Sequence, residues 1–260
     1  MTSAPTVSRP LVHARQAVIG YQSALVQPFD LTVCTGEFWA IIGPNGGGKT
    51  TLVRTLIGAL KPVSGQVVRS PANLRVGYVP QRHNLQRGLP LTAADVVMLG
   101  RTPLWQLGRG PGNADRDAVL RALDRTGARE FAEHPFDSLS GGQQQRALVA
   151  RALAAEAEVL ALDEPTDNVD LTGEGELVEL IAQLHREGLT ILMVGHDIGP
   201  AVHHATHVCL VDRQRGRITA GPVAEVFDEA RLSEVYGRPM SIEYGDDCVH
   251  VHVKGGTRAA

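Results

Sequence analysis

Apolar residues along the chain gather in short continuous runs that alternate with segments of helical spacing. The run from Glu37 to Ile42 predicts a buried strand, and the glycine-dense turn Gly43–Gly48 follows it directly. A helix is expected to begin at Lys49, because the apolar residues after it fall on one helical face. They are Leu52, Val53, Leu56, Ile57 and Leu60.

Two further apolar runs, Val159–Leu162 and Leu189–Val194, flank a second periodic helix. Strands that alternate with helices in this way indicate an α/β domain with a mainly parallel sheet. The apolar face of this second helix carries Leu177, Leu180, Ile181 and Leu184.

The stretch between Arg82 and Ser138 differs in texture from its surroundings. Helix-like patterns cover Ala93–Leu99 and Arg116–Thr126, and the loop-prone Gly108–Asn113 joins them. We therefore expect a helical subdomain inserted into the α/β core. After Ala220 we expect two short helices and a frayed polar tail. The expected division is a flexible N-terminus at 1–10, a core at 11–81 and 139–220, the helical subdomain at 82–138, and a short C-terminal extension at 221–260.

Composition places the chain among globular proteins with a sizeable core, since 43% of its residues are hydrophobic and 20% are charged. A formal net charge of -3 gives no general attraction for nucleic acid, which we do not expect as a partner. The cysteines are few and widely spaced, which indicates a reducing compartment such as the cytosol. No run approaches the roughly 18 apolar residues of a membrane helix, and residues 1–10 lack the apolar core of a signal peptide, so any membrane role is expected to come through a partner.

The strongest chemical signal matches the phosphate-loop pattern GxxxxGK[ST] between a strand and a helix. Its glycines let backbone N–H groups converge on phosphate oxygens at a helix N-terminus, whose partial positive charge adds to that of Lys49. Lys49 is expected to hold the β- and γ-phosphates, and the Thr50 hydroxyl to ligate Mg²⁺. A glycine-rich turn with a chance lysine is the alternative, but motif and context agree. The loop consists of Gly43, Pro44, Asn45, Gly46, Gly47, Gly48, Lys49 and Thr50.

Two adjacent carboxylates, Asp163 and Glu164, end the apolar strand that begins at Val159. Ligands of α/β sheets bind at this end of the strands. Because strand residues alternate between faces, the two acids are expected to point apart and to have separate tasks. Asp163 is expected to hold the Mg²⁺ shell, and Glu164 to orient and polarise the attacking water. Without the phosphate loop, an ordinary surface pair at a strand end would be the default interpretation.

A third motif, Leu139-Ser-Gly-Gly-Gln-Gln-Gln-Arg146, precedes a helix expected over Gln143–Ala155. By itself, Ser140 would be an ordinary helix cap. The helix start is also a second anion-binding terminus, which one nucleotide on a phosphate loop does not obviously need. A second copy of the chain could bring this terminus to the γ-phosphate.

Together the three motifs resemble those of the nucleotide-binding subunits of ABC transporters, over roughly residues 12 to 220. The resemblance implies an ATPase with a P-loop NTPase core, an N-terminal antiparallel β part and the inserted helical subdomain. It also implies a dimer in which each ATP lies between one subunit's phosphate loop and the other's signature helix. The nucleotide contacts implied beyond the phosphate loop are Thr51, Ser140, Gly141, Gly142 and Gln143.

The same resemblance implies roles for four isolated positions. Gln81 would contact Mg²⁺ or the attacking water, Asp170 would lie at the dimer interface, and His196 would contact the γ-phosphate. A lone histidine is usually structural or solvated, but His196 follows a strand next to the predicted site. Tyr21 would stack on adenine, whereas an isolated tyrosine in a strand more often serves packing.

Within this family, several segments resemble those of the zinc and manganese importer ATPases. They are GPNGGGKTTL, Val76–Arg82, Leu89–Thr92, Asp95–Arg101 and Leu192–Asp197. ATPases of iron-chelate, siderophore or cobalamin importers are the alternative. A soluble ABC ATPase of cluster assembly is a further alternative, and a sensing module without turnover conflicts with the presence of Glu164. The implied partners are a second copy or a homologous ATPase subunit, integral membrane permease subunits and an extracytoplasmic substrate-binding protein. The implied location is the cytoplasmic face of the cell membrane.

Two further groups of residues have the chemistry of metal ligands. His203 and His207 are four apart and would share a helical face, whereas Cys248, His250 and His252 would share one face of an extended strand. Neither group completes a four-ligand set, and a solvated helix face and a frayed tail explain them as well. We therefore assign no metal site to them.

Overall fold

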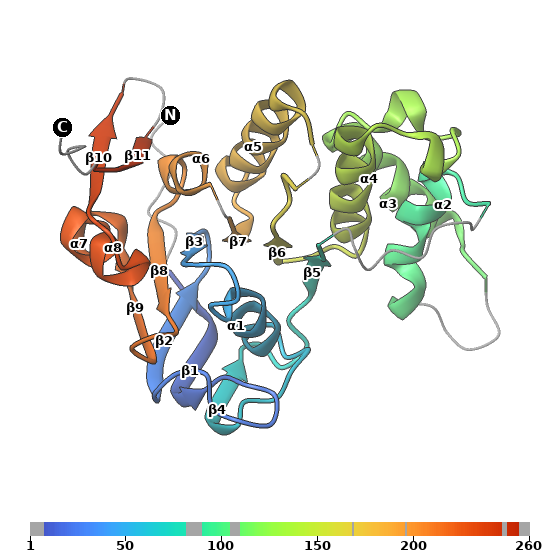
Figure 1. The fold of residues 1–260 in the computed structure, drawn as a ribbon. Coiled ribbons are helices and arrows are strands. Elements are labelled where there is room, and N and C mark those ends of the chain that lie inside the picture. The colour runs from blue at the N-terminus through green and yellow to red at the C-terminus, as the bar shows by residue number, and fades with distance from the viewer. Residues whose placement is uncertain are drawn as a thin grey trace, which may run out of the picture. The chain divides into compact units, whose positions relative to one another are not determined.

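The computed structural model describes residues 8–81, 90–104, 110–167, 169–195, 197–245 and 249–254. The chain divides into two compact units, the first made of residues 1–72 with 192–260 and the second of residues 73–191. Figure 1 shows the elements of both units, coloured from blue at the N-terminus to red at the C-terminus. Each unit is described by itself below.

An antiparallel sheet in the order β2-β1-β4 forms one part of the first unit. Val12 of β1 pairs with Val33 on one side and with Arg69 on the other. Val12 and Ala14 are buried on the same face of β1, so this face covers a core. The predicted N-terminal antiparallel part is therefore confirmed. The strands are β1 (Pro10–Val18), β2 (Phe29–Cys34) and β4 (Ser64–Arg69).

The other strands of the first unit combine parallel and antiparallel pairing. Strand β3 (Phe38–Ile42) is buried along its whole length and pairs in parallel with β8 (His207–Asp212). Strand β9 (Arg217–Pro222) then pairs antiparallel with β8. Continuous burial of β3 is typical of parallel sheets that are covered on both faces. Strand β7 (Thr190–Val194) begins in the second unit and ends in the first.

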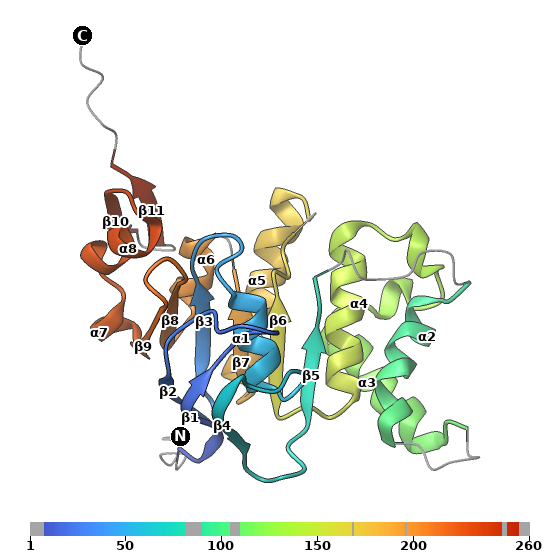
Figure 2. The same cartoon turned by 60° about the horizontal axis from the view of Figure 1, so that its bottom comes forward.

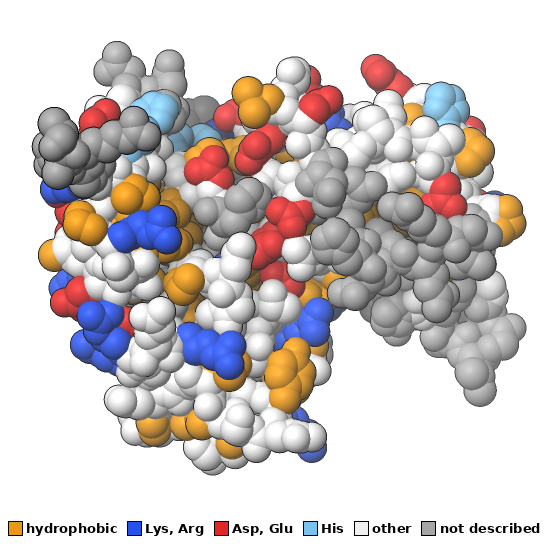
Figure 3. Space-filling view, viewed as in Figure 1, with side chains coloured by type: hydrophobic (Ala, Val, Ile, Leu, Met, Phe, Trp, Pro, Cys, Tyr) orange, Lys and Arg blue, Asp and Glu red, His pale blue; other side chains and the backbone are white. Residues whose placement is uncertain are grey.

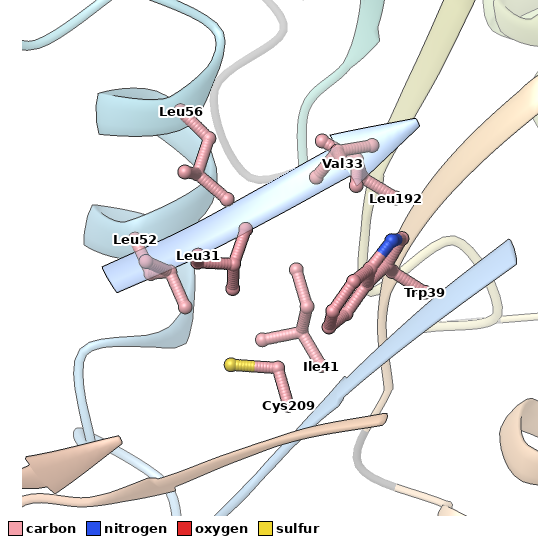
Figure 4. Close-up of a pocket in the computed structure, with 8 residues that line it drawn as sticks. All are labelled: Leu31, Val33, Trp39, Ile41, Leu52, Leu56, Leu192 and Cys209. Carbon is pink, nitrogen blue, oxygen red and sulfur yellow. The ribbon is translucent and has the colours of Figure 1, made fainter. Parts of the chain in front are cut away.

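Side chains from several elements of the first unit meet in its core (Figure 4). Helix α1 (Lys49–Leu56) contributes Leu52 and Leu56, each at most 1% exposed, as the helical spacing predicted. The helix ends before Leu60, so its apolar face is shorter than expected. Burial raises the pKa of the Cys209 thiol to about 12, so this side chain stays neutral and packs as a small apolar group. The figure labels Leu31, Val33, Trp39, Ile41, Leu52, Leu56, Leu192 and Cys209.

The C-terminal part of the first unit corrects the predicted frayed tail. The two expected short helices are present, but a hairpin of β10 and β11 follows them, next to α8 in Figures 1 and 2. Val249 of β11 packs so closely on α6 that a Cβ at Gly199 would come within 2.1 Å of the Val249 carbonyl oxygen. The elements are α6 (Ile198–His203), α7 (Val223–Val226), α8 (Glu229–Tyr236), β10 (Met240–Tyr244) and β11 (Val249–Val253). Residues 255–260 lie outside the described part.

The pair His203 and His207 does not share a helical face, and this prediction was wrong. Helix α6 ends at His203, and His207 opens strand β8. The His207 ring instead stacks on Trp39 with a centroid distance of 4.6 Å. The strand begins here because Thr206 binds the backbone of Phe38 and so starts the pairing of β8 with β3.

The second unit combines a parallel strand pair with a group of helices. Strand β5 (Val76–Val79) pairs with β6 (Val159–Asp163), and Gly77 lies so close to α4 that a Cβ there would come within 2.7 Å of the Ala152 Cβ. Helices α2, α3 and α4 pack on one another, as Figures 1 and 2 show. The helices are α2 (Ala93–Met98), α3 (Asn113–Arg125), α4 (Gly141–Ala154) and α5 (Leu171–Arg186), with 3-10 helices at Leu99–Leu104, Arg129–Phe131 and Phe136–Ser138. None of the helices within the described ranges combines the length and the apolar character that crossing a membrane requires.

A buried arginine ties the helices of the second unit together. Arg101 is 7% exposed, and it donates to the Ala154 carbonyl at 2.8 Å and to the Asp115 carboxylate at 2.9 Å. The backbone of Gly112 and the Arg101 side chain lower the pKa of Asp115. Asp115 also accepts the Gly112 N–H and thereby starts α3 at Asn113, three residues before the predicted helix.

Candidate active site

The phosphate loop, residues 43–50, joins β3 to α1 in the first unit. Gly43 has φ of +156° and lies against β8, where an added Cβ would come within 2.5 Å of the Val211 carbonyl oxygen. Gly46 and Gly48 have φ of +71° and +102°, a left-handed backbone that glycine adopts without strain. The loop therefore requires glycine at these three positions for backbone reasons.

Lys49 begins α1 and is only 4% exposed. Its Nζ donates to the carbonyl oxygens of Gly43 at 3.0 Å and Pro44 at 3.3 Å, so the ammonium group lies against the loop. The N-cap residue Gly48 supplies no side-chain cap, and the first turn of α1 contains no acidic residue. The positive end of the helix dipole and the ammonium group can therefore both act on a bound anion. Thr50 and the buried Thr51 follow in the same turn.

Two contacts from outside the motif also reach this loop. The Arg213 guanidinium donates from Nη1 to the Gly46 carbonyl oxygen at 2.8 Å. Burial raises the pKa of the Tyr236 hydroxyl to about 12, and a hydrogen bond with the Gly43 backbone opposes part of this rise. No sequence motif pointed to Arg213 or Tyr236.

Tyr21 lies in a bend after β1 and not in a strand, as the packing interpretation had assumed. Its side chain is 64% exposed, so packing does not explain the residue. The Arg54 guanidinium donates to its hydroxyl at 3.4 Å. An exposed ring in this state has a free face on which a base can stack.

The carboxylate pair lies in the second unit. Asp163, the last residue of β6, is 1% exposed and accepts a hydrogen bond from the Tyr78 hydroxyl at 3.0 Å. Gln81 donates from Nε2 to Glu164 at 2.8 Å and to Asp167 at 2.7 Å. The structure therefore brings Gln81 and Glu164 together, as residues of one site should be. Sequence reasoning missed the contacts from Tyr78 and Asp167.

Strand alternation does not set the direction of Glu164, and this prediction is corrected here. Strand β6 ends at Asp163, and Glu164 has φ of +49°. A non-glycine residue in this region is uncommon and is usually held there by its surroundings. Here Glu164 accepts the Gln81 amide through its side chain and the Asp167 N–H through its backbone, at 3.3 Å.

The signature residues open helix α4 through a reciprocal capping box. The Ser140 hydroxyl accepts the Gln143 N–H at 3.3 Å, and the Gln143 side chain accepts the Ser140 N–H at 3.0 Å. Asp170 caps the neighbouring helix α5 by accepting the Gly173 N–H at 2.8 Å. Residues of two separate sequence motifs thus cap the neighbouring N-termini of α4 and α5.

Both helix starts line one hollow of about 520 Å³ in the second unit. An ion pair between Arg146 and Glu176 at 2.6 Å spans α4 and α5 at this hollow. Acidic side chains also gather over α5 in Figure 3, so the surface is not broadly basic. The N–H groups of Gly141 and Gly142 in the first turn of α4 have no intrahelical acceptor, and they are the donors that an anion could use here. The lining includes Ser140, Gly141, Gly142, Gln143, Arg146, Asp170, Gly173 and Glu176.

Two of the singled-out residues cannot be placed, because His196 and Cys248 lie outside the described residues. His250 and His252 share one face of β11 and stack with a centroid distance of 5.9 Å. Within the described ranges, no group of three or more His, Cys, Asp or Glu side chains is arranged to hold a metal ion.

Comparison with known proteins identifies the family. The model of the ABC transporter family matches residues 26–167, more than half of the chain. The zinc import ATP-binding protein ZnuC of Pseudomonas entomophila is 37% identical over 234 residues, which span 89% of this chain and 86% of that protein. The manganese transport system ATP-binding protein MntB of Bacillus subtilis is 35% identical over 222 residues, which span 84% of this chain and 88% of that protein. The chain belongs to the ABC transporter family.

Within that family it is one of the ATP-binding subunits, which are ATPases. A solved metal-chelate type ABC transporter in an inward-facing conformation matches it with a TM-score of 0.85 and 25% identity, over 95% of this chain and 98% of that chain. The dimeric structure of a bacterial ABC transporter cassette matches with a TM-score of 0.69 and 26% identity, over 82% of this chain and 99% of that chain. The predicted α/β fold of an ABC ATPase is thereby confirmed.

Proposed function

We propose that this chain binds and hydrolyses MgATP to energise the import of a divalent metal ion, zinc or manganese. The observation that carries the metal is the similarity, over more than four-fifths of the chain, to a zinc import and a manganese transport ATP-binding protein. The geometry of the phosphate loop and of the carboxylate pair supports the nucleotide chemistry.

The phosphate loop binds the triphosphate. The Lys49 ammonium donates to the Gly43 and Pro44 carbonyl oxygens in this structure. When the triphosphate binds, it redirects some or all of these N–H groups to the β- and γ-phosphates. Backbone N–H groups of the loop, other than at Pro44, which has none, supply further donors, and the α1 dipole adds to the attraction. Tyr21 stacks on the adenine ring with its exposed face.

The donor groups proposed for magnesium have the chemistry that this ion prefers. Thr50 offers a hydroxyl and Asp163 a carboxylate, and oxygen donors of this kind are what Mg²⁺ prefers. The Gln81 amide nitrogen makes both bonds to carboxylates, so its oxygen is the atom that can face the metal. When bound with the nucleotide, Mg²⁺ neutralises charge on the β- and γ-phosphates.

Hydrolysis depends on Glu164, which orients and polarises the attacking water. Its backbone is left-handed, and the Gln81 amide fixes the direction of its carboxylate. His196 contacts the γ-phosphate in this proposal, as the family resemblance implies. Removal of the Glu164 charge therefore affects turnover and not nucleotide binding.

The hollow at the starts of α4 and α5 receives the nucleotide of a second subunit. One chain carries both a phosphate loop and a separate anion-binding helix start at this hollow, and two chains can exchange them. In this proposal the ATPase pair works with integral membrane permease subunits and an extracytoplasmic binding protein at the cytoplasmic face of the membrane.

A second candidate cargo is a metal chelate, such as a siderophore-bound iron or cobalamin. It is favoured by the match to the metal-chelate type transporter, which covers 95% of this chain. Cargo contacts lie in other subunits, so a transport measurement separates the two candidates.

The test measures zinc, manganese and iron content and short-term uptake in cells of the source organism that lack this chain. Wild type or Glu164→Gln is then returned to these cells at matched abundance. We expect a selective zinc or manganese deficit that only the wild type restores. A deficit confined to chelated iron would favour the second candidate, and normal uptake of every metal would contradict a transport role.

A further inference from the structure

The end of β8 and the turn between β8 and β9 contact the phosphate loop. Gly43 packs on the Val211 carbonyl at the end of β8, and the Arg213 guanidinium donates to the Gly46 carbonyl at 2.8 Å. Val211 and Arg213 are two residues apart in the chain, so one short segment contacts both the start and the apex of the loop. These contacts all lie within the first unit.

The Gly46 carbonyl matters because of the loop's chemistry. A loop that binds phosphate must point its N–H groups at the anion and its carbonyl oxygens away from it. Lys49 already binds the carbonyl oxygens of Gly43 and Pro44. Gly46 sits at the exposed apex with φ of +71°, a position at which glycine has many alternative conformations. The Arg213 guanidinium donates to this Gly46 carbonyl.

The segment that carries Arg213 is itself held firmly. Asp212 is 5% exposed and accepts the Arg215 N–H at 3.0 Å and the Arg215 guanidinium at 3.2 Å. The Arg215 guanidinium also donates to the Glu234 carbonyl of α8. The Gln27 N–H donates to the Gly216 carbonyl at 2.6 Å. The backbone that carries the Arg213 side chain is therefore held in place, which is the condition for Arg213 to position another group.

We propose that Arg213 is a positioning residue for nucleotide binding, which keeps the phosphate loop in its anion-binding shape by holding the Gly46 carbonyl. The proposal rests on the proposed role of this loop in binding ATP. Arg213 does not contact the phosphates in this account, so its loss weakens binding without changing the chemical step.

The test compares Arg213→Ala and Arg213→Lys with the control Arg217→Ala in the full-length protein. Arg217 is an exposed arginine of the adjacent strand β9, so its removal changes the charge equally without touching the loop. MgATP Kd, KM and kcat are measured at low and at high salt. For Arg213→Ala we expect Kd and KM to rise about five-fold, the equivalent of one net hydrogen bond, with kcat within about two-fold. Arg213→Lys keeps the positive charge and N–H donors but loses the guanidinium geometry, so its Kd and KM should fall between those of the wild type and those of Arg213→Ala.

Salt distinguishes positioning from simple attraction of ATP. A short hydrogen bond persists at about 0.5 M salt, whereas attraction between exposed charges is largely screened. An effect that disappears at high salt, or an equal effect of Arg217→Ala, would overturn the proposal. Lys49→Ala separates the two levels of the argument: if it weakens binding and Arg213→Ala does not, only this inference fails. If Lys49→Ala leaves binding unchanged, the proposed role of the loop fails first.

Discussion

Glu164 combines an uncommon backbone conformation with a fixed side chain. Its φ of +49° is uncommon for a residue other than glycine, and such a backbone persists where the surrounding structure holds it. The Gln81 amide bridges its carboxylate and that of Asp167. Two nearby carboxylates repel each other, and a shared amide donor offsets part of this repulsion while it orients Glu164.

Gln81→Ala is therefore expected to slow hydrolysis more than it weakens nucleotide binding. Loss of a group that orients a catalytic carboxylate or a metal ligand typically costs about 10–100-fold in activity. Gln183→Ala is the control, because Gln183 also donates an amide to a carboxylate, that of Glu187, but on the exposed side of α5. Steady-state ATPase assays check this expectation, and equal rates for the two variants would contradict it.

Helix starts are the elements that organise the second unit's hollow. Asp170 caps α5 and Ser140 caps α4, and each satisfies an N–H group that the helix itself cannot. The same side chains line the surface where a second subunit is proposed to bind. In the proposal, a cap at this position contributes both to stability and to assembly.

Asp170→Ala and Asp228→Ala separate these two contributions. Asp228 caps α8 in the same way, by accepting the Arg231 N–H at 2.8 Å, but it lies in the first unit. Each substitution should lower the free energy of unfolding by about 1 kcal/mol. Only Asp170→Ala should also weaken ATP-dependent pairing of subunits. Chemical unfolding and analytical ultracentrifugation measure the two effects, and matched pairing defects would contradict the assignment.

Helix α8 gives a prediction about alkaline stability through Tyr236. Burial raises its pKa to about 12 in the folded chain, whereas an unfolded tyrosine ionises near pH 10. The folded state therefore keeps its proton longer, and this contribution to stability is complete below about pH 10 and is lost as the pH rises to about 12. Between these values the wild type should lose up to about 3 kcal/mol more than Tyr236→Phe. Urea unfolding at pH 9 and pH 11 measures the free energy of unfolding of both proteins. An equal loss in the wild type and in Tyr236→Phe between these two pH values would contradict this prediction.

Periodicity predicted the elements whose apolar residues are buried. Leu177 and Leu184 lie in α5 and β3 is buried throughout, as expected from their spacing. The sequence suggested an extended strand around His250 and His252, but its hairpin with β10 was missed, because a five-residue alternation such as Val-His-Val-His-Val near a polar terminus is too short to indicate a partner strand. The division into a core and a helical subdomain at 82–138 stays a prediction.

The phosphate loop and the carboxylate pair could be predicted from sequence because their chemistry depends on local spacing. Contacts between distant residues could not. Gln81 and Glu164 are 83 residues apart, and Arg213 and Gly46 are 167 apart. The left-handed backbone of Glu164 was also missed, because alternation along a strand does not indicate where the strand ends.

At the scale of the whole molecule, the site residues are divided between two units and, in the proposal, between two chains. The phosphate loop belongs to the first unit, and the carboxylate pair and the signature residues belong to the second. ATP binding without hydrolysis should therefore stabilise a pair of chains. Glu164→Gln with MgATP is expected to elute as a dimer in size-exclusion chromatography, whereas Lys49→Ala with MgATP should remain monomeric.

The most direct measurement compares MgATP binding and phosphate release by purified wild type, Glu164→Gln and Lys49→Ala. The account predicts that Glu164→Gln retains ATP affinity but loses at least about 100-fold in turnover, because the base is gone while the loop is intact. Lys49→Ala should instead lose affinity itself. Full turnover by Glu164→Gln, or unchanged ATP affinity in Lys49→Ala, would contradict the account.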